Sequence, residues 1–537
     1  MALNGITLAR TLECAAAETQ TLSRFLNDLD GWGGVDCDTG TNAALTLAAM
    51  RDALADLDES ASFAEALELA INAGITKAVG TIGVILTSQL AAWARSIDGA
   101  AALTPVTIRR MLTTDLASDD QRLTVSEAIT HVLAEAHDET WGLGMTIPDE
   151  DYLISWYSLS AQQGIVNAIN EQSNLLDAGA CVLAVLFASF DSTVRDSTDG
   201  LESLAQMLAG IADADSYGPA PRPNPPQPGR DFTVDIVWEG TVDEATRLFD
   251  SIEAVGAKLN CVGAVDLFSM GTWRLHVDTS APLSVHPRFG RTLRFCVADA
   301  RPDEELGVDE LDNTGITHRG VRLLERRPRR RVERARVIAC TKAPGLVDYL
   351  ARSGAVVLLY PTIDDAPGIE YLAACSSTGV ALILPADEAD AELAHACQQH
   401  LATGEEDATV LIVAPTRDDL SVLSAAQTCA GFFVPQPGGR ATAPVMQTIL
   451  ADGARRAHAA SSVVALAGDG DELGVIAAVS DIARISPTRW RLLMGRGDGP
   501  ELAALIRQLI ARYSPIADIT VIDGGQDGTS LIQGLRA

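Results

Sequence analysis

Residues 30–42 read DGWGGVDCDTGTN, an acidic and glycine-rich stretch that leads into a predicted helix. Asp36 and Asp38 flank a single residue, and two like charges about 4 Å apart repel by about 1 to 4 kcal/mol. A bound cation would offset that repulsion. The residues from Thr39 to Asn42 form a predicted helix start, whose free N–H groups suit a phosphate.

Carboxylates beside a phosphate site indicate Mg²⁺, because this ion prefers one or two carboxylates together with substrate phosphates. The simpler alternative is a turn followed by a helix N-cap, since Asp, Gly and Thr are common in both. On composition alone, both interpretations fit residues 30–42.

The longer stretch LDGWGGVDCDTGTNAALTL resembles the metal-binding loop of the dihydroxyacetone kinase L-subunit superfamily, and most closely that of fatty acid kinase A-type proteins. Asp36 and Asp38 keep the acidic positions of the family pattern Asp-Gly-Asp-Thr-Gly-Thr-Asn-Met, whereas Cys37 and Ala43 depart from it. Asp30 stands where the L-subunits place a third acidic ligand. The resemblance implies that Asp30, Asp36 and Asp38 bind Mg²⁺ and are catalytic.

Two further stretches resemble motifs of the same superfamily. KAVGTIGVIL, residues 77–86, is similar to a turn that lies against the nucleotide phosphates, with Thr81 and Ile82 in place of Asn and Ser. DAGA, residues 177–180, is similar to the turn that closes over the nucleotide. Each would also fit an ordinary helix start, but the order of the three motifs favours the superfamily. The ATP-binding residues that the resemblance implies are Thr39, Gly40, Thr41, Asn42, Gly80, Thr81, Gly83, Asp177, Ala178 and Gly179.

The length, charge and cysteine content limit the number of domains and the kinds of partner that the chain can have. Its 537 residues suffice for about three domains. The net charge of −32 argues against a nucleic-acid or anionic-membrane partner. Nine cysteines without a Cys-x-x-Cys pair indicate neither a disulfide framework nor a zinc ribbon, so we expect a reducing cytoplasm.

The sequence shows neither a targeting signal nor a P-loop. The first residues lack the basic and apolar regions of a secretory signal. The longest uncharged apolar run, from Ala178 to Phe190, is shorter than the roughly 20 residues that cross a bilayer, so we expect no transmembrane segment. Gly-x-x-x-x-Gly-Lys-[Ser/Thr] does not occur, which excludes a P-loop ATPase.

The apolar spacing predicts a multidomain chain. Residues 1–216 show helical periodicity, and the resemblance implies that this all-α domain is a helical barrel. A Pro-rich linker at 217–231 precedes a small α+β domain at 232–317, and an Arg-rich linker at 318–335 precedes an α/β domain at 336–537. Helices in the first domain are predicted at about 6–29, 42–57, 61–72, 83–97, 124–137, 151–170 and 179–190.

The Arg-rich linker stands out in an acidic protein, because residues 319–336 contain nine arginines. One interpretation is a docking surface for an acidic partner or an anionic headgroup. The other, which we favour, is a solvated linker that folds back on the acidic surface of the protein itself.

A second metal site is implied by the resemblance alone. In fatty acid kinases the middle domain binds zinc through a Cys and a His-x-His pair. Here His276 keeps the first His, Asp278 stands at the second, and Asp235 lies near the Cys position. Alternation along a strand puts His276 and Asp278 on one face, and Asp and His are compatible with zinc.

The resemblance implies an ATP-dependent phosphotransferase that acts on the carboxylate of a fatty acid and forms an acyl phosphate. A DegV-like fatty-acid-binding protein would present the acceptor, and the C-terminal stretch VIDGGQDGTSLIQGL resembles the DegV-related domain that helps to engage it. A homodimer is also implied. The acceptor is ionised at pH 7, so no general base is required. A dihydroxyacetone (glycerone) kinase, and a nucleotide-binding regulatory or scaffold subunit, stay open as alternatives.

Overall fold

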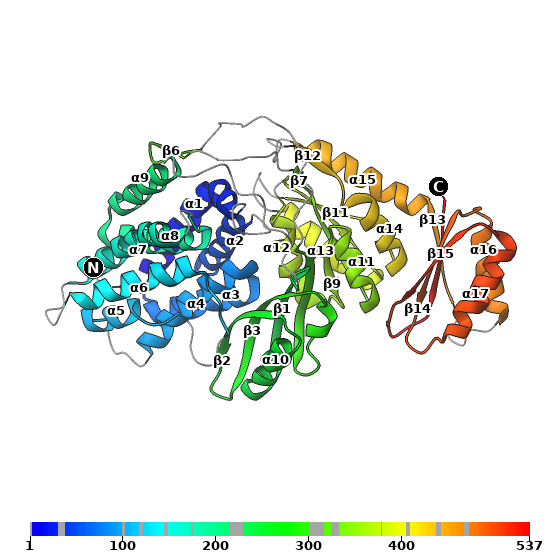
Figure 1. Cartoon of the computed structure of the whole chain (residues 1–537), viewed down its shortest axis with the longest axis horizontal. Helices are drawn as coiled ribbons and strands as arrows, with labels where there is room; N and C mark the ends of the chain where they lie inside the picture. Colours follow the sequence, from blue (N-terminus) through cyan, green and yellow to red (C-terminus); the bar gives the residue numbers. More distant parts are fainter. Residues whose placement is uncertain are drawn as a thin grey trace.

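The computed structural model shows a helical region followed by an α/β region with two mixed sheets (Figure 1). The described residues contain three hydrophobic cores, one in the helical region and one around each of the two larger sheets. The structure describes residues 3–30, 38–98, 103–116, 122–143, 149–172, 176–213, 229–300, 316–323, 332–376, 378–403, 409–435, 442–466 and 472–536.

The described residues up to 213 form helices and no strands, as predicted for the first domain. Each predicted helix is present, and two helices that were not predicted, α5 and α9, join them. Helix α5 is too short for apolar periodicity to reveal it. It nevertheless starts with a recognisable cap, because the Thr104 side chain accepts from the Thr107 N–H and Pro105 follows Thr104. The helices are α1 (Gly5–Asp30), α2 (Thr39–Asp52), α3 (Phe63–Lys77), α4 (Gly80–Ile97), α5 (Pro105–Leu112), α6 (Glu127–Gly142), α7 (Glu150–Gln172), α8 (Ala178–Arg195) and α9 (Asp199–Asp213).

Helix α8 forms the centre of the helical core. By length and composition it could cross a membrane, but 78% of it is buried inside the protein. It packs against α1, α7 and α9. A helix that is apolar on all sides is typical of the interior of a protein as well as of a membrane. Burial among other helices therefore accounts for the apolar character of α8.

Eight strands form the large sheet, in the order β11-β10-β8-β9-β4-β1-β3-β2. Strands β8 to β11 pair in parallel, whereas β4, β1, β3 and β2 pair antiparallel. The bounds are β1 (Phe232–Thr241), β2 (Lys258–Val265), β3 (Met270–Thr279), β4 (Arg291–Asp299), β8 (Arg336–Thr341), β9 (Val356–Leu359), β10 (Val380–Leu384) and β11 (Val410–Val413). The helices around it are α10 (Val242–Ala254), α11 (Val347–Arg352), α12 (Ala366–Ala374), α13 (Glu388–Ala402), α14 (Asp419–Cys429) and α15 (Ala443–Ala459).

The large sheet joins two ranges, 232–317 and 336–537, that the sequence analysis treats as separate domains. Strand β4 pairs antiparallel with β9, and Cys296 lies opposite Leu358. The same hydrophobic core contains Phe232 and Leu450. Pairing β4 with β9 satisfies backbone groups that two separate sheets would leave open at their edges.

A smaller sheet near the C-terminus has its own core. Its strands follow the order β13-β16-β14-β15, and α16 and α17 pack against it (Figure 1). Strands β14 and β15 pair in parallel, whereas β16 pairs antiparallel with both β13 and β14. The bounds are β13 (Ser461–Ala465), α16 (Glu472–Ala483), β14 (Arg489–Met494), α17 (Pro500–Tyr513), β15 (Asp518–Asp523) and β16 (Leu531–Leu535).

The first described residues of the Arg-rich linker, 318–323, return to the helical region. Strands β5 (Ile316–His318) and β6 (Val321–Leu323) form a hairpin beside α1 and α9 (Figure 1). Glu18 of α1 accepts from Nη2 of Arg319 at 2.6 Å and lies 2.7 Å from Nε2 of His318. Arg319 therefore folds back on an acidic residue of the protein itself, as favoured above. Residues 324–331, and residues 217–228 of the Pro-rich linker, lie outside the described part of the chain.

Candidate functional site

The starts of α2 and α4 come together, and they carry the first two predicted motifs. Gly80 has φ +61°, and a Cβ atom there would lie 2.8 Å from Nδ2 of Asn42. Thr46 connects the same two helices, because its hydroxyl donates to the Asn42 carbonyl at 2.8 Å and accepts from Val79 N–H at 3.3 Å. The fold thus places the stretch 39–42 directly beside the turn into α4.

Asn27, which the sequence analysis missed, holds the start of α2 in place. Its Oδ1 accepts from the Thr41 N–H at 3.0 Å, and its Nδ2 donates to the Thr41 hydroxyl at 2.8 Å. The signal was present in the sequence, since Asn is a poor residue for the interior of a helix. Thr41 is therefore part of the support of the helix start as well as a predicted nucleotide contact.

Three predicted nucleotide-binding glycines have a packing role. A Cβ atom at Gly40 would collide with the Ser23 carbonyl of α1. One at Gly83 would lie 2.8 Å from the Thr46 hydroxyl, and one at Gly179 would lie 2.9 Å from Cδ1 of Ile129. The contact at Gly40 requires glycine whether or not a ligand binds, because a backbone carbonyl occupies the Cβ position, whereas side-chain atoms lie in the way at Gly83 and Gly179. None of these three glycines has a positive φ; among the predicted nucleotide-binding glycines, the left-handed backbone conformation occurs at Gly80.

The third predicted motif forms a helix cap. Oδ1 of Asp177 accepts from the Ala180 N–H at 2.7 Å at the start of α8. Ala178 is buried, and Gly179 packs against α6. This geometry matches the alternative of an Asp N-cap, which also stabilises the helix by about 1 kcal/mol.

The acidic residues of the first motif are described only in part. Asp38 immediately precedes α2, and its carbonyl accepts from the Asn42 N–H at 2.8 Å. Asp30 ends α1, but its side chain lies outside the described part of the chain, as does the whole of Asp36. Thr39 and Thr81 are half-buried in the first turns of α2 and α4.

A polar face of the large sheet packs against this end of the helical region. Val262 of β2 belongs to the hydrophobic core of the helices. Arg274 of β3 lies opposite Val262, and Arg294 of β4 donates through Nη1 to the Thr76 carbonyl at 3.0 Å. Because Thr76 lies in the last turn of α3, the sheet meets the helices just before the Gly80 turn.

Two residues lie between the sheet and the first motif: Tyr371 of α12, and Cys375, which directly follows α12. Tyr371 packs against Thr46 of α2, and burial raises its pKa well above the usual range. Burial raises the pKa of Cys375 to about 11, and the carboxylates of Asp38 and Asp235 add to the rise. Asp38 of the helical region and Asp235 of the sheet therefore both lie within electrostatic range of one thiol.

The predicted zinc residues lie together but form an ion-pair cluster. Oδ1 of Asp235 accepts from Nη2 of Arg274 at 2.9 Å and lies 3.0 Å from Nδ1 of His276. Nε2 of His276 lies 3.8 Å from Oδ1 of Asp278. Although burial opposes ionisation, Arg274 and His276 hold the pKa of Asp235 at about 2.

These residues do not fit a zinc ion. Arg274, which the sequence analysis missed, supplies the positive charge beside Asp235. Throughout the described residues, no group of three His, Cys, Asp or Glu side chains is arranged to hold a metal ion. The register of β1 and β3 brings Asp235 opposite His276, so the predicted proximity is correct while the proposed ligand set is not supported.

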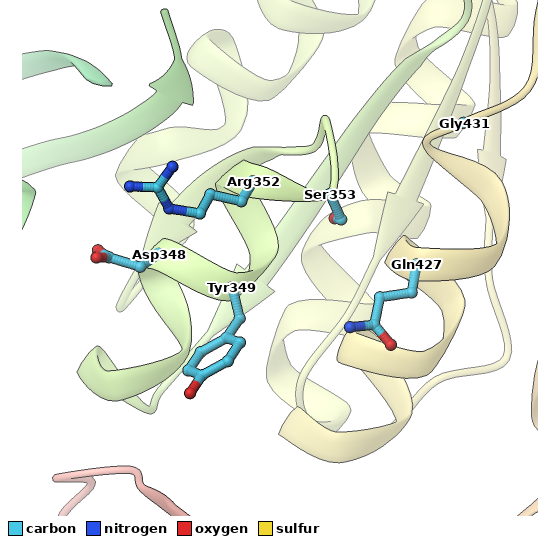
Figure 2. Close-up of a pocket in the computed structure, with 6 residues that line it drawn as sticks. All are labelled: Asp348, Tyr349, Arg352, Ser353, Gln427 and Gly431. Atoms are coloured by element: carbon cyan, nitrogen blue, oxygen red, sulfur yellow. The ribbon is translucent and has the colours of Figure 1, made fainter. Parts of the chain in front are cut away.

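A pocket of about 590 Å³ lies elsewhere, between α11 and α14 (Figure 2). None of the predicted site residues lines it. Arg352 stacks over the ring of Phe232, and Gln427 accepts from Arg491 at 2.6 Å, so two of its polar side chains already have partners. The residues that line the pocket are Asp348, Tyr349, Arg352, Ser353, Gln427 and Gly431.

Residues 35–140 match the family model of the DAK2 domain. This domain is similar to the L-subunit of dihydroxyacetone kinase, so this part of the helical region is similar to kinase-related proteins. The match runs from the acidic stretch through most of α6 and includes the Gly80 turn, but it ends before Asp177. No curated protein matches the chain.

Proposed function

We propose that the chain is an ATP-dependent phosphotransferase whose nucleotide lies at the starts of α2 and α4. The observation that carries the proposal is the contact between Gly80 and Asn42, which joins two motifs within a DAK2 match. The Gly80 turn opens helix α4, and the free N–H groups at a helix start favour a phosphate. Phosphoryl transfer depends mainly on positioning and charge neutralisation, which such a turn can supply.

The residues of the first motif would hold the metal and the nucleotide. Asp38, with Asp30 and Asp36, would hold Mg²⁺, which neutralises phosphate charge when bound. Asn42 is buried beside Gly80 and offers an amide to the phosphates. Tyr371 and Arg294, which cover this end of the helices, would exclude water from the site.

The proposed acceptor is the carboxylate of a fatty acid that a DegV-like binding protein presents. A carboxylate oxygen would form a bond to the γ-phosphorus while the bond to the bridging oxygen of ATP breaks, and that electron pair leaves with ADP. The product is an acyl phosphate. The region 336–537 would engage the binding protein, and a homodimer and a cytoplasmic location belong to the same proposal.

Turnover with defined acceptors tests this function. Purified protein receives Mg²⁺ and ATP with oleate bound to its binding protein, or with dihydroxyacetone, and phosphorus NMR follows the products. We expect ADP together with an acyl phosphate that hydroxylamine traps. Phosphorylated dihydroxyacetone would instead identify a glycerone-type kinase. Retained Mg²⁺–ATP binding without turnover would identify a regulatory or scaffold subunit, and absence of both would refute the proposal.

A further inference from the structure

Arg274 is a buried cation in the contact between the large sheet and the helical region. Its side chain is only 3% exposed. It lies opposite Val262 on β2 and Val237 on β1, so these three side chains share one face of the sheet. Because Val262 belongs to the core of the helical region, Arg274 faces the helices and not the sheet's own core.

The guanidinium of Arg274 has more donors than partners. Nη2 donates to Asp235 at 2.9 Å. Within the described part of the chain, Nε and Nη1 are buried and meet no hydrogen-bond acceptor. Burying charged donors without acceptors is unfavourable, and the described residues supply no acceptor for Nε and Nη1.

A second arginine lies on the same face. Arg294 flanks Val237 on the side opposite to Arg274. Its Nε is 3.8 Å from Oδ1 of Asp365 and makes no hydrogen bond to the described residues. Gly368 of α12 packs directly on this guanidinium, which fixes its place. Burial, and then the charge of Arg274, lower the pKa of Arg294, so the two cations lie close enough to repel.

The pair lies beside the proposed nucleotide site. Arg294 donates to Thr76, which precedes Gly80 by one short turn. Tyr371 packs against Thr46 and lies within electrostatic range of Arg274. An anion that Arg274 holds would therefore lie between the sheet and the end of the helices where α2 and α4 begin.

We propose that Arg274, with Arg294 beside it, binds an oxyanion between the large sheet and the helical region. The planar fork of a guanidinium matches a carboxylate or a phosphoryl group. The choice between these two ligands rests on the proposed function, in which the fatty acid acceptor carries a carboxylate and ATP carries phosphoryl groups. Binding itself does not depend on turnover, so it can be measured even if the reaction differs.

Calorimetric titrations with three probes test the site: inorganic phosphate, Mg²⁺–ATP and octanoate. The variants are Arg274→Lys, which keeps the charge and loses the fork, and the double variant Arg274→Gln with Asp235→Asn, which removes both charges of the ion pair. Arg291→Gln is the control, because Arg291 lies on the same strand as Arg294 but its side chain is 62% exposed. Circular dichroism and thermal unfolding check that each variant is folded.

We expect Arg274→Lys and the double variant to weaken binding of at least one probe by about tenfold or more, and Arg291→Gln to leave it unchanged. Loss confined to phosphate and ATP identifies a phosphoryl group, and loss confined to octanoate identifies a carboxylate. Unchanged binding of all three probes by a folded variant overturns the proposal, as does a wild-type protein that binds none of them.

If neither variant folds, crystals of the wild-type protein soaked with the tightest probe decide the question. Density for the anion within hydrogen-bond distance of Arg274 supports the site, and density only elsewhere overturns it. A wild-type protein that binds an oxyanion here but transfers no phosphate would retain this inference while refuting the proposed function.

Discussion

Asn42 of α2 lies directly over Gly80, so that a Cβ atom at Gly80 would be 2.8 Å from Nδ2 of Asn42. This relationship joins two sequence motifs through space. It also explains why glycine is required at position 80, where the backbone has φ +61° and the neighbouring side chain leaves no room for a Cβ atom.

Gly80→Ala should destabilise the protein and weaken Mg²⁺–ATP binding. The left-handed conformation costs a residue with a Cβ about 1 to 2 kcal/mol, and the Asn42 amide would also have to move. Urea unfolding and calorimetry measure both effects. Gly142→Ala is the control, because nothing lies within 4 Å of the Cβ position at this helical glycine. Equal stability and equal ATP affinity of the two variants would contradict the packing described for Gly80.

Asn27→Ala should lower the free energy of unfolding by about 1 to 3 kcal/mol, because two hydrogen bonds to Thr41 are lost and Thr41 is left partly unsatisfied. Asn72→Ala is the matched control, since Asn72 is an exposed residue in α3 with the same helix propensity. Denaturant unfolding of both variants isolates the role of the Asn27 side chain. A stability as high as that of Asn72→Ala would show that Asn27 does not hold the start of α2.

Glu18→Gln should detach the β5–β6 hairpin from α1. Burial raises the pKa of Glu18, but hydrogen bonds from His318 and Arg319 outweigh it and lower the pKa below 4.5. The carboxylate therefore stabilises the fold fully above pH 4.5, and this contribution is lost as the pH falls through the folded-state pKa. We expect a loss of about 1 to 3 kcal/mol at pH 7 that shrinks in acid.

Thermal and urea unfolding at several pH values measure this loss. Glu13→Gln, an exposed change on the same helix, is the control and should be neutral. A destabilisation by Glu18→Gln that does not vary between pH 7 and pH 3 would rule out the charge of Glu18 as its cause.

Much of the helical region could be predicted from the sequence, because helical periodicity and caps are local signals. The predicted helices from 6–29 to 179–190 are present as α1–α4 and α6–α8. The motif resemblance implied that the stretch 39–42 and the Gly80 turn share a nucleotide site, but no local pattern predicted the contact between Asn42 and Gly80. Helix α5 was missed because it is too short to show apolar periodicity, and Asn27 was missed because its role depends on a contact with another helix.

The sheet region was harder to predict, because strand pairing is not local. Alternation placed His276 and Asp278 on one face correctly, but nothing in the pattern reveals that β4 pairs with β9 or that Arg274 pairs with Asp235. The predicted zinc residues therefore lie close together, as strand alternation predicts, but Asp235 pairs with Arg274.

Asp419→Asn should remove the free-energy cost of ionising a buried carboxylate in the α/β region, a cost that depends on pH. Burial raises the pKa of Asp419 to about 6 from the ordinary 3.8, although the Thr341 hydroxyl and the Lys342 N–H donate to it. The folded protein then binds more protons than the unfolded chain between these values, so stability falls as the pH rises from 3.8 to about 6.

Relative to the wild type, Asp419→Asn should gain up to about 3 kcal/mol in free energy of unfolding between pH 4 and pH 7. Denaturant unfolding across this range measures the gain. The control is Asp481→Asn, an exposed helix residue with 58% of its side chain accessible. Parallel pH profiles for Asp419→Asn and the wild type would disagree with a raised pKa at this position.

Calorimetric binding of ATP to the wild type and to Asp38→Asn, with and without Mg²⁺, tests the proposed nucleotide and metal site most directly. Asp52→Asn, an exposed change at the other end of α2, serves as the control. We expect Mg²⁺-dependent ATP binding that Asp38→Asn weakens by about tenfold or more and Asp52→Asn leaves unchanged. Binding of Mg²⁺–ATP by folded Asp38→Asn as tight as that of the wild type would contradict a metal site at Asp38.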